Sequence, residues 1–407
     1  MVQRLILRNF RSFKEVDMEL RPLNIVVGAN ASGKTNLVQA FRFLRDIARH
    51  GLENAVALQG GAEYLTNLNS PGTRECHIEI VFTPHLTLRR VSKERLLPNV
   101  KVDEVRHSLT IRAIRKTNSA KIVREQLEVR YIVSEADTAN LIITREGGMA
   151  RMEVSSPTLL DILSPKRPFL ATRRRFEIEQ HVSLMQLAPL LSRLPPFFYE
   201  ESIAIYDFSP KLAKQAVPIA SHLTLSEDGA NLPLIVQQIL RSPPARERLL
   251  RLLRMVLPYI KQLLVTTPFG QHVSLQIQET YFDRRTLPAA LLSDGTVEMV
   301  ALIVAMFFSP FNPQLLIFEE PDRNLHPGVM SALMALFHEA SENTQILITT
   351  HNPALVRQAE VSDLLLIERD SEGNSVLKRP ADSQSVRIFL EEQLGLDYLL
   401  TQNLLGA

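Results

Sequence analysis

The sequence contains little cysteine, little glycine and no excess of either charge. Its single cysteine, Cys76, excludes an intrachain disulfide and any zinc or iron–sulfur site built from cysteines, as is typical of a reducing compartment. The 46 basic side chains are nearly balanced by 44 acidic ones, so the overall charge does not indicate an obligate nucleic-acid binder. No stretch approaches the roughly 18 uninterrupted apolar residues of a membrane span, and Arg8 interrupts the first apolar segment too early for a signal peptide. We therefore expect a cytoplasmic globular protein without a membrane partner.

The chain of 407 residues is long for one domain, and its patterns divide it into three parts. Residues 1–155 combine short strands and a helix with an alternating segment that is typical of an antiparallel β-lobe. Residues 156–265 have clustered prolines and helical apolar spacing, and predict a mainly helical insertion; it includes a helix at 246–264 that Pro258 kinks or ends. Residues 266–407 alternate helices with short apolar runs that indicate buried parallel strands. We predict an α/β fold with a mixed sheet core built from both ends of the chain.

Residues 28–35 read GANASGKT and fit the phosphate-binding pattern G-x-x-x-x-G-K-[ST]. An apolar run at 23–27 precedes the loop, and apolar residues at helical spacing follow it up to Gly51. In this context we expect the backbone amides to point at phosphate oxygens, Lys34 to reach the β- and γ-phosphates, and the Thr35 hydroxyl to bind Mg²⁺. The alternative is a glycine-containing turn that only caps a helix. However, the chain has only 15 glycines, so two glycines at the spacing of Gly28 and Gly33 are less expected by chance.

Three further segments lie downstream at the ends of predicted elements. Glu319 and Glu320 follow the apolar run 315–318, where one carboxylate can hold the hydration shell of Mg²⁺ and its neighbour can polarise an attacking water; alternatively, they begin a solvated helix. Ser293 precedes a long apolar helix, either at an anion-binding N-terminus or as an ordinary N-cap. His351 follows the next apolar run and is either functional or structural.

The order of these motifs distinguishes among classes of nucleotide-binding protein. About 285 residues separate the loop from the two glutamates, whereas small nucleotide kinases place such motifs much closer together. A Ras-like GTPase needs a guanine-specifying Asn-Lys-x-Asp, which the sequence lacks. The ATP subunit of a membrane transporter is disfavoured by the long insertion between the loop and Ser293.

Over nearly its whole length the chain resembles bacterial AAA-family ATPases of the ABC/SMC/RecF superclass, within it the short "predicted ATPase" group related to overcoming-lysogenization-defect nucleases. The matching segments are residues 7–13 (LRNFRSF), the Walker A loop 28–35, 227–232 (EDGANL), the signature-like 292–296 (LSDGT), the Walker B and D-loop segment 318–327 (FEEPDRNLHP) and the H-switch 349–353 (TTHNP). The resemblance implies an ABC/SMC-like P-loop NTPase fold that uses ATP and Mg²⁺ and hydrolyses ATP.

The resemblance also implies a role for individual residues. Glu320 would position the lytic water, His351 would sense the γ-phosphate, and Lys34 would act on the transferred phosphate. Nucleotide contacts would come from Arg11, Gly28, Asn30, Ala31, Ser32, Gly33, Lys34, Thr35 and Asn36, and from Ser293 and Gly295 of a second chain, with Thr35 and Glu319 at the metal.

Four positions depart from the family pattern or match it weakly. Glu319 stands where much of the superclass has aspartate, Ala31 replaces a glycine, and Glu298 stands where relatives often carry arginine. Gln59 is the candidate for the Q-loop glutamine, although an ordinary loop residue is the alternative.

The expected partner is a second copy of the chain, because this superclass forms head-to-tail dimers in which ATP joins the two faces. DNA is a further expected partner, since residues 85–125 carry 11 basic and four acidic side chains and residues 173–175 add three arginines; a solvated face is the alternative. The sequence has no H-E-x-x-H, G-x-S-x-G or Asp-x-Asp cluster outside the ATP motifs, and the roughly 56 residues after His351 are too few for a Toprim domain. A separate effector protein, a nuclease or a toxin, is therefore expected in a repair or anti-phage process. The alternative function is an ATP-controlled scaffold that holds or releases an effector without DNA.

Overall fold

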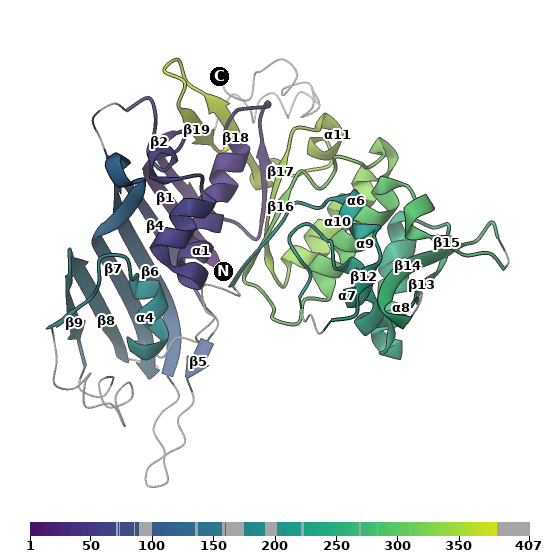
Figure 1. Ribbon diagram of the computed structural model, residues 1–407, viewed down its shortest axis with the longest axis horizontal. Helices are drawn as coiled ribbons and strands as arrows, with labels where there is room; N and C mark the ends of the chain where they lie inside the picture. The colour runs from purple at the N-terminus through teal and green to yellow at the C-terminus, as the bar shows by residue number, and fades with distance from the viewer. Residues whose placement is uncertain are drawn as a thin grey trace, which may run out of the picture. The chain divides into compact units, whose positions relative to one another are not determined.

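The computed structural model describes residues 1–70, 72, 74–84, 86–88, 100–134, 137–156, 159, 175–191, 202–220, 224–267, 270–282 and 284–380 (Figure 1). The chain forms two units. The first unit comprises Met1–Arg21, Ala31–Ile203 and Ile367–Leu377; the second comprises Pro22–Asn30, Ala204–Leu366 and Lys378–Ala407. The boundary between the two units near residue 203 falls inside residues 156–265, and the division into three parts stays a prediction.

An antiparallel sheet dominates the first unit (Figure 1). Alternating burial along its strands places apolar side chains on one face, as predicted for the β-lobe. In the order of the sheet, the strands are β10 (Arg175–Glu177), β9 (Met149–Val154), β8 (Asp137–Glu146), β7 (Ser119–Ser134), β6 (Val100–Ile114), β4 (Glu75–Phe82), β1 (Val2–Phe10) and β2 (Phe13–Glu19), while β5 (Leu86–Leu88) pairs with β6.

Helix α1 (Lys34–Leu58) provides the main helical packing in this unit. Leu37, Phe41, Leu44 and Ile47, the apolar residues predicted at helical spacing, are all buried. The helix is interrupted at Gly51, whose φ of 80° and ψ of 167° are not helical. The remaining described elements of this unit are the short η1 (Ala62–Tyr64) and η2 (Arg115–Thr117), helix α4 (Leu184–Leu191), and most of β19 (Ser375–Lys378).

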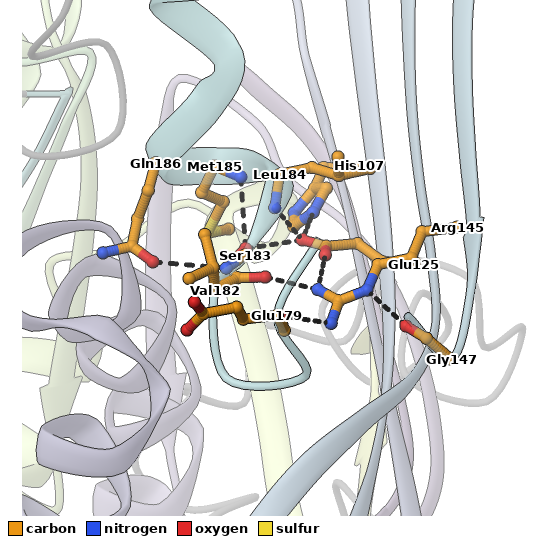
Figure 2. Close-up of polar contacts among 10 residues, drawn as sticks. All are labelled: His107, Glu125, Arg145, Gly147, Glu179, Val182, Ser183, Leu184, Met185 and Gln186. Atoms are coloured by element: carbon orange, nitrogen blue, oxygen red, sulfur yellow. Dashed lines mark hydrogen bonds and ion pairs between the residues drawn. The ribbon is translucent and has the colours of Figure 1, made fainter. Parts of the chain in front are cut away.

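A buried ionic cluster attaches the segment before α4 to the sheet (Figure 2). Glu125 on β7 accepts hydrogen bonds from Ser183 Oγ and from the backbone amide of Leu184 (2.9 Å), and it lies 2.9 Å from His107 Nε2 on β6. Arg145 on β8 faces Glu125 (3.4 Å) and donates to backbone carbonyls of the same segment. All three ionisable side chains are fully buried, so the carboxylate of Glu125 and the guanidinium of Arg145 depend on each other for compensation of charge.

The second unit is built on a parallel sheet. Its order is β11 (Ile203–Tyr206), β16 (Leu315–Glu319), β17 (Gln345–Thr350), β3 (Leu23–Val27) and β18 (Leu364–Arg369), of which residues 364–366 belong to this unit. The neighbouring pairs β16–β17, β17–β3 and β3–β18 are parallel, as predicted from the short apolar runs. Helices α9 (Asp294–Phe307) and α10 (Met330–Ser341) contribute to the same apolar core, and nearly all of α9 is buried.

A smaller antiparallel sheet also belongs to the second unit: β12 (Val217–Pro218), β14 (His272–Glu279) and β13 (Ile260–Thr266), with β15 (Leu287–Pro288) on β14. Helices α6 (Pro210–Ala213), α7 (Leu232–Leu240), α8 (Pro243–Val256) and α11 (Pro353–Val356), with turns η4 (Ala289–Leu291), η5 (Pro327–Val329) and η6 (Val361–Asp363), complete the unit.

The helix predicted over residues 246–264 ends before Pro258, which is one of the two outcomes expected for it. Helix α8 ends at Val256, before Pro258, and Ile260 begins β13. Proline cannot donate the backbone hydrogen bond that continues a helix, so the chain leaves the helix at this point. Within the described part of the chain, no helix is long and apolar enough to cross a membrane.

Candidate nucleotide-binding site

In the first unit, residues 31–36 carry the second half of the Walker A loop. Helix α1 begins at Lys34 after Gly33, whose φ of 119° is left-handed and which, as glycine, has no side chain to cap this end. A Cβ on Gly33 would lie 2.2 Å from Ser375 Oγ, so only glycine fits. The hydroxyl of Ser32 is buried and finds no hydrogen-bond partner among the described residues. An uncapped helix start beside an unsatisfied hydroxyl suits the binding of an anion.

The loop backbone is held by residues that lie far from it in sequence. Ser375 Oγ lies 2.6 Å from the carbonyl oxygen of Ser32 and 2.8 Å from Ser12 Oγ, and Asn36 Nδ2 donates to Ser12 Oγ (2.8 Å). Arg369 Nε donates to the carbonyl oxygen of Ala31 (3.0 Å), where Ala31 has a positive φ of 65°. These contacts fix the conformation in which the loop amides are presented. Lys34 is buried at the helix start, and Thr35 is exposed.

Arg11 and Gln59, two predicted candidates, contact each other in the first unit. An Arg11 guanidinium nitrogen donates to Gln59 Oε1 (2.5 Å) and to the Gln59 carbonyl oxygen (3.1 Å). Burial lowers the pKa of Arg11 from its usual value. Gln59 therefore holds the guanidinium of Arg11, and a contact of Arg11 with phosphate stays a prediction.

In the second unit, the parallel strands bring three of the predicted segments to one edge. The register pairs Glu319 on β16 with Thr349 on β17, and Thr350 on β17 with Val27 on β3. Gly28, the first residue of the loop, therefore follows the end of the strand beside the one that precedes His351.

Glu320 is the most constrained residue of this edge. Its φ of 45° is left-handed, which is rare for a residue other than glycine, and its amide donates to Thr349 O (3.0 Å) and approaches Thr349 Oγ1 (3.2 Å). Its carboxylate lies 3.1 Å from His351 Nδ1 on one side and 3.3 Å from Arg323 on the other. Strain of this kind is retained where the surrounding structure requires one side-chain direction.

The signature-like segment and the D-loop contact each other within the second unit. Ser293 caps α9, because its Oγ accepts from the amide of Thr296 (3.1 Å). A Cβ on Gly295 would lie 2.6 Å from the carbonyl oxygen of Asn324, and Asn324 Nδ2 donates to Glu298 (2.7 Å). Burial raises the pKa of Glu298 to about 7 despite this hydrogen bond.

The D-loop is also attached to β17. Asp322 accepts a hydrogen bond from Thr350 Oγ1 (2.9 Å), and burial raises the pKa of Asp322. The start of α9 and the end of β17 are therefore joined through residues 322–324.

The predicted site residues divide between the two units. Ala31–Asn36 and Arg11 belong to the first unit, whereas Gly28–Asn30, Ser293, Gly295, Glu319, Glu320 and His351 belong to the second. Among the described residues there is no group of three or more histidine, cysteine, aspartate or glutamate side chains suited to a metal ion. Mg²⁺ in phosphate-binding proteins is held by one or two protein oxygens with phosphate and water. A hydroxyl such as that of Thr35 and a carboxylate such as that of Glu319 are ligands of this kind, and their part in a metal site stays a prediction.

The predicted basic surface is partly neutralised across strands. Arg106 faces Glu79 and Glu104, Arg112 pairs with Glu75 (2.8 Å), and Arg124 pairs with Glu146 (3.2 Å). Three of these four acids lie in neighbouring strands or outside residues 85–125, so a count along the sequence omits them. Arg89, Arg90, Lys93, Arg95, Arg173 and Arg174 lie outside the described residues.

The chain is similar to known ATPases in sequence. The model of a family described as "AAA domain, putative AbiEii toxin, Type IV TA system" matches residues 23–357. A stretch of 95 residues is 32% identical to the DNA replication and repair protein RecF of Corynebacterium jeikeium (strain K411), and covers 23% of this chain and 22% of that relative. A stretch of 44 residues is 43% identical to the same-named protein of Halalkalibacterium halodurans, and covers 11% of this chain and 12% of the relative. The chain thus spans less than a quarter of these relatives.

The fold has a counterpart among solved structures. The crystal structure of the SmcHead bound to the C-winged helix domain of ScpA has a TM-score of 0.53 at 14% identity, covering 93% of this chain and 97% of that one. At this identity the likeness shows the fold, an ABC/SMC-like P-loop NTPase with a mixed α/β architecture and a large antiparallel sheet. Because the family model spans most of the sequence, the chain belongs to this AAA family, and the predicted relationship to ATPases of the ABC/SMC/RecF type is confirmed.

Proposed function

We propose that the protein binds ATP through the loop at residues 28–35 and hydrolyses it with Glu320 and His351. The observation that carries this proposal is the strained backbone of Glu320, which directs its carboxylate toward His351 at the sheet edge where the loop begins. The unsatisfied Ser32 hydroxyl and the uncapped start of α1 support phosphate binding by the other half of the loop.

In this proposal each residue has a role that follows from its chemistry. The ammonium of Lys34 compensates phosphate charge, and the ionised Glu320 accepts a hydrogen bond from the attacking water and orients it. Because a carboxylate only accepts, the hydrogen between Glu320 and His351 lies on Nδ1, which leaves Nε2 to face the nucleotide. Mg²⁺, held by Thr35 and through water by Glu319, would neutralise charge on the phosphates.

The direct test is a pair of variants assayed for nucleotide binding and for phosphate release. Lys34→Ala should abolish ATP binding, and Glu320→Gln should retain binding but lose turnover. Normal nucleotide affinity in the Lys34→Ala protein would contradict the assignment of the loop.

We further propose that ATP joins two copies of the chain head to tail. Ser293 is exposed at the start of α9, and a helix N-terminus attracts an anion such as the γ-phosphate of a nucleotide on a second copy. Hydrolysis would then remove the charge that holds the faces together. Light scattering of the Glu320→Gln protein should show a doubled mass with ATP and Mg²⁺ but not with ADP, and a mass that stays monomeric with ATP would refute dimerisation.

For the process that ATP drives, we propose a DNA-linked one, repair or anti-phage defence with a separate effector, supported by the similarity to proteins named for DNA replication and repair. The second candidate, an ATP-controlled scaffold for an effector protein, is favoured by the cross-strand pairing of Arg106, Arg112 and Arg124, which leaves the described β-lobe less basic than its sequence suggests. Duplex DNA should stimulate ATP hydrolysis, with a stimulation that falls steeply with salt, only if the first candidate is correct.

A further inference from the structure

We propose that a groove between α7, α8 and β13 in the second unit binds an extended acidic segment of a partner protein, which adds to β13 as a new strand. The three elements pack against one another within this unit (Figure 1). The proposal does not depend on ATP binding, because none of the groove residues belongs to the nucleotide motifs.

The groove consists of two adjoining cavities with volumes of about 720 and 450 Å³. They share Glu247, Leu250 and Arg254 of α8, which makes them one continuous depression. Leu240 of α7 and Leu263 of β13 add further apolar surface. A groove of this size with an apolar lining accommodates alternate side chains of a short extended peptide.

An open strand edge faces this groove. Strand β13 ends the order β12-β14-β13 in the described sheet, so it pairs with β14 on one side only among the described residues. Residues 261–265 all line the groove in succession. Since side chains of a strand alternate between its faces, five consecutive residues can line one cavity only if the backbone edge points into it.

Arg254 covers the beginning of this edge. Its guanidinium donates to the carbonyl oxygens of Ile260 (3.1 Å) and Lys261 (2.5 Å), where the pairing of β13 with β14 is irregular. The first carbonyls of β13 are therefore already covered, and residues 262–265 form the part that a partner strand can pair with. Exposed edges of this kind are usually covered or blunted in stable proteins.

The charge around the groove selects an acidic partner. Residues 241–261 carry six basic side chains and one acidic one, and Arg241, Arg246, Arg251, Arg254 and Lys261 all line the two cavities. A peptide with acidic residues between apolar ones would place its carboxylates at this basic rim and its apolar side chains on the leucines. Nucleic acid satisfies the charge but offers no amide backbone to continue the β-ladder, so we favour the peptide.

The test uses the full chain and a defined set of probes. These are fluorescein-labelled eight-residue peptides with Asp or Glu at alternate positions and Val, Ile, Leu or Phe between them, the same peptides with Lys for the acids, and a 15-nucleotide single-stranded DNA. The variant Arg246→Glu/Arg251→Glu changes two exposed groove residues. Its control, Arg284→Glu/Arg285→Glu, makes the same charge change at exposed residues of this unit that do not line the groove.

At least one acidic peptide should bind the wild type and the control at least tenfold more tightly than the groove variant, while the lysine peptides bind neither. Binding should slow hydrogen exchange of the amides at 262–265, and should persist in Lys34→Ala, which separates it from the nucleotide proposal. The proposal is overturned if no acidic peptide shows this difference, if bound peptide leaves exchange at 262–265 unchanged, or if the DNA binds in an Arg246- and Arg251-dependent manner more tightly than every peptide.

Discussion

Substitutions of Glu320 can separate the catalytic role of its carboxylate from the strain of its left-handed backbone. Three variants suffice: Glu320→Gln keeps the size of the side chain, Glu320→Ala removes its contacts, and Glu320→Gly removes the same contacts and the Cβ. The last two both lose the interactions with His351 and Arg323, so their difference in stability reports the backbone alone.

The expected difference follows from the φ of 45° at residue 320. Left-handed backbone costs a residue with a Cβ about 1–2 kcal/mol, whereas glycine loses about 0.5–1 kcal/mol more conformational entropy than alanine on folding. The Gly variant should therefore be more stable than the Ala variant by about 0.5–1 kcal/mol. At an ordinary strand or helix position the stabilities would be reversed, and an alanine variant would be more stable than a glycine variant by a similar amount.

Urea unfolding followed by circular dichroism measures the stability, because the chain contains no tryptophan, and hydrogen exchange of β17 amides assigns the change to the second unit. All three variants should bind ATP, with phosphate release reduced about 10²–10⁴-fold, as expected for loss of a group that orients and activates water. An Ala variant at least as stable as the Gly variant would refute the strain, and near-normal turnover in the Gln variant would refute the catalytic role.

Three other predictions concern groups whose surroundings the structure defines. Glu125→Ala should lower the stability of the first unit by about 3–5 kcal/mol in denaturant unfolding, since it leaves Arg145 buried without its carboxylate; the exposed Glu146→Ala should cost under about 1 kcal/mol, and equal losses would contradict the argument. Gly295→Ala should displace Asn324, leaving ATP binding intact while turnover falls and stability drops by about 1–3 kcal/mol; unchanged turnover would count against a role for this contact. The pKa of Glu298 is raised by burial to about 7, so the folded state favours its protonated form: the contribution to stability is complete below the usual carboxyl pKa of 4.5 and is lost as pH rises through 7. Glu298→Gln should therefore become more stable than the wild type above pH 7, with the advantage fading toward pH 4.5, and a difference independent of pH would exclude this titration.

Elements that depend only on residues close together in the sequence could be predicted from it. The apolar run before the loop, the helical spacing after it and the runs before Glu320 and His351 are local patterns, and the structure confirms each as β3, α1, β16 and β17. The parallel pairing of these strands then follows from their burial on both faces.

Features that join distant segments were not predicted. Ser375 supports the loop from more than 300 residues away, and no pattern around it marks that role. The cluster of Glu125, His107 and Arg145 did leave a signal, because each occupies the buried phase of an alternating strand, such as Glu125 in line with Leu127. A charged residue at a buried, otherwise apolar position of a strand predicts a charged or hydrogen-bonding partner on an adjacent strand.

Basic surfaces are another feature that the sequence predicts only in part, in both units. Along β6 and β7, arginines such as Arg112 meet glutamates of neighbouring strands, because cross-strand neighbours lie within about 5 Å while residues next to each other in sequence point to opposite faces. On α8, by contrast, residues three or four positions apart share one side, so Arg251 and Arg254 lie together. Arg246, about two turns before Arg254, lines the same groove, with Glu247 as the one acid among them. A basic run in the sequence therefore predicts a basic surface more reliably on a helix than on a sheet, which is why we assign the acidic partner to the groove of α8.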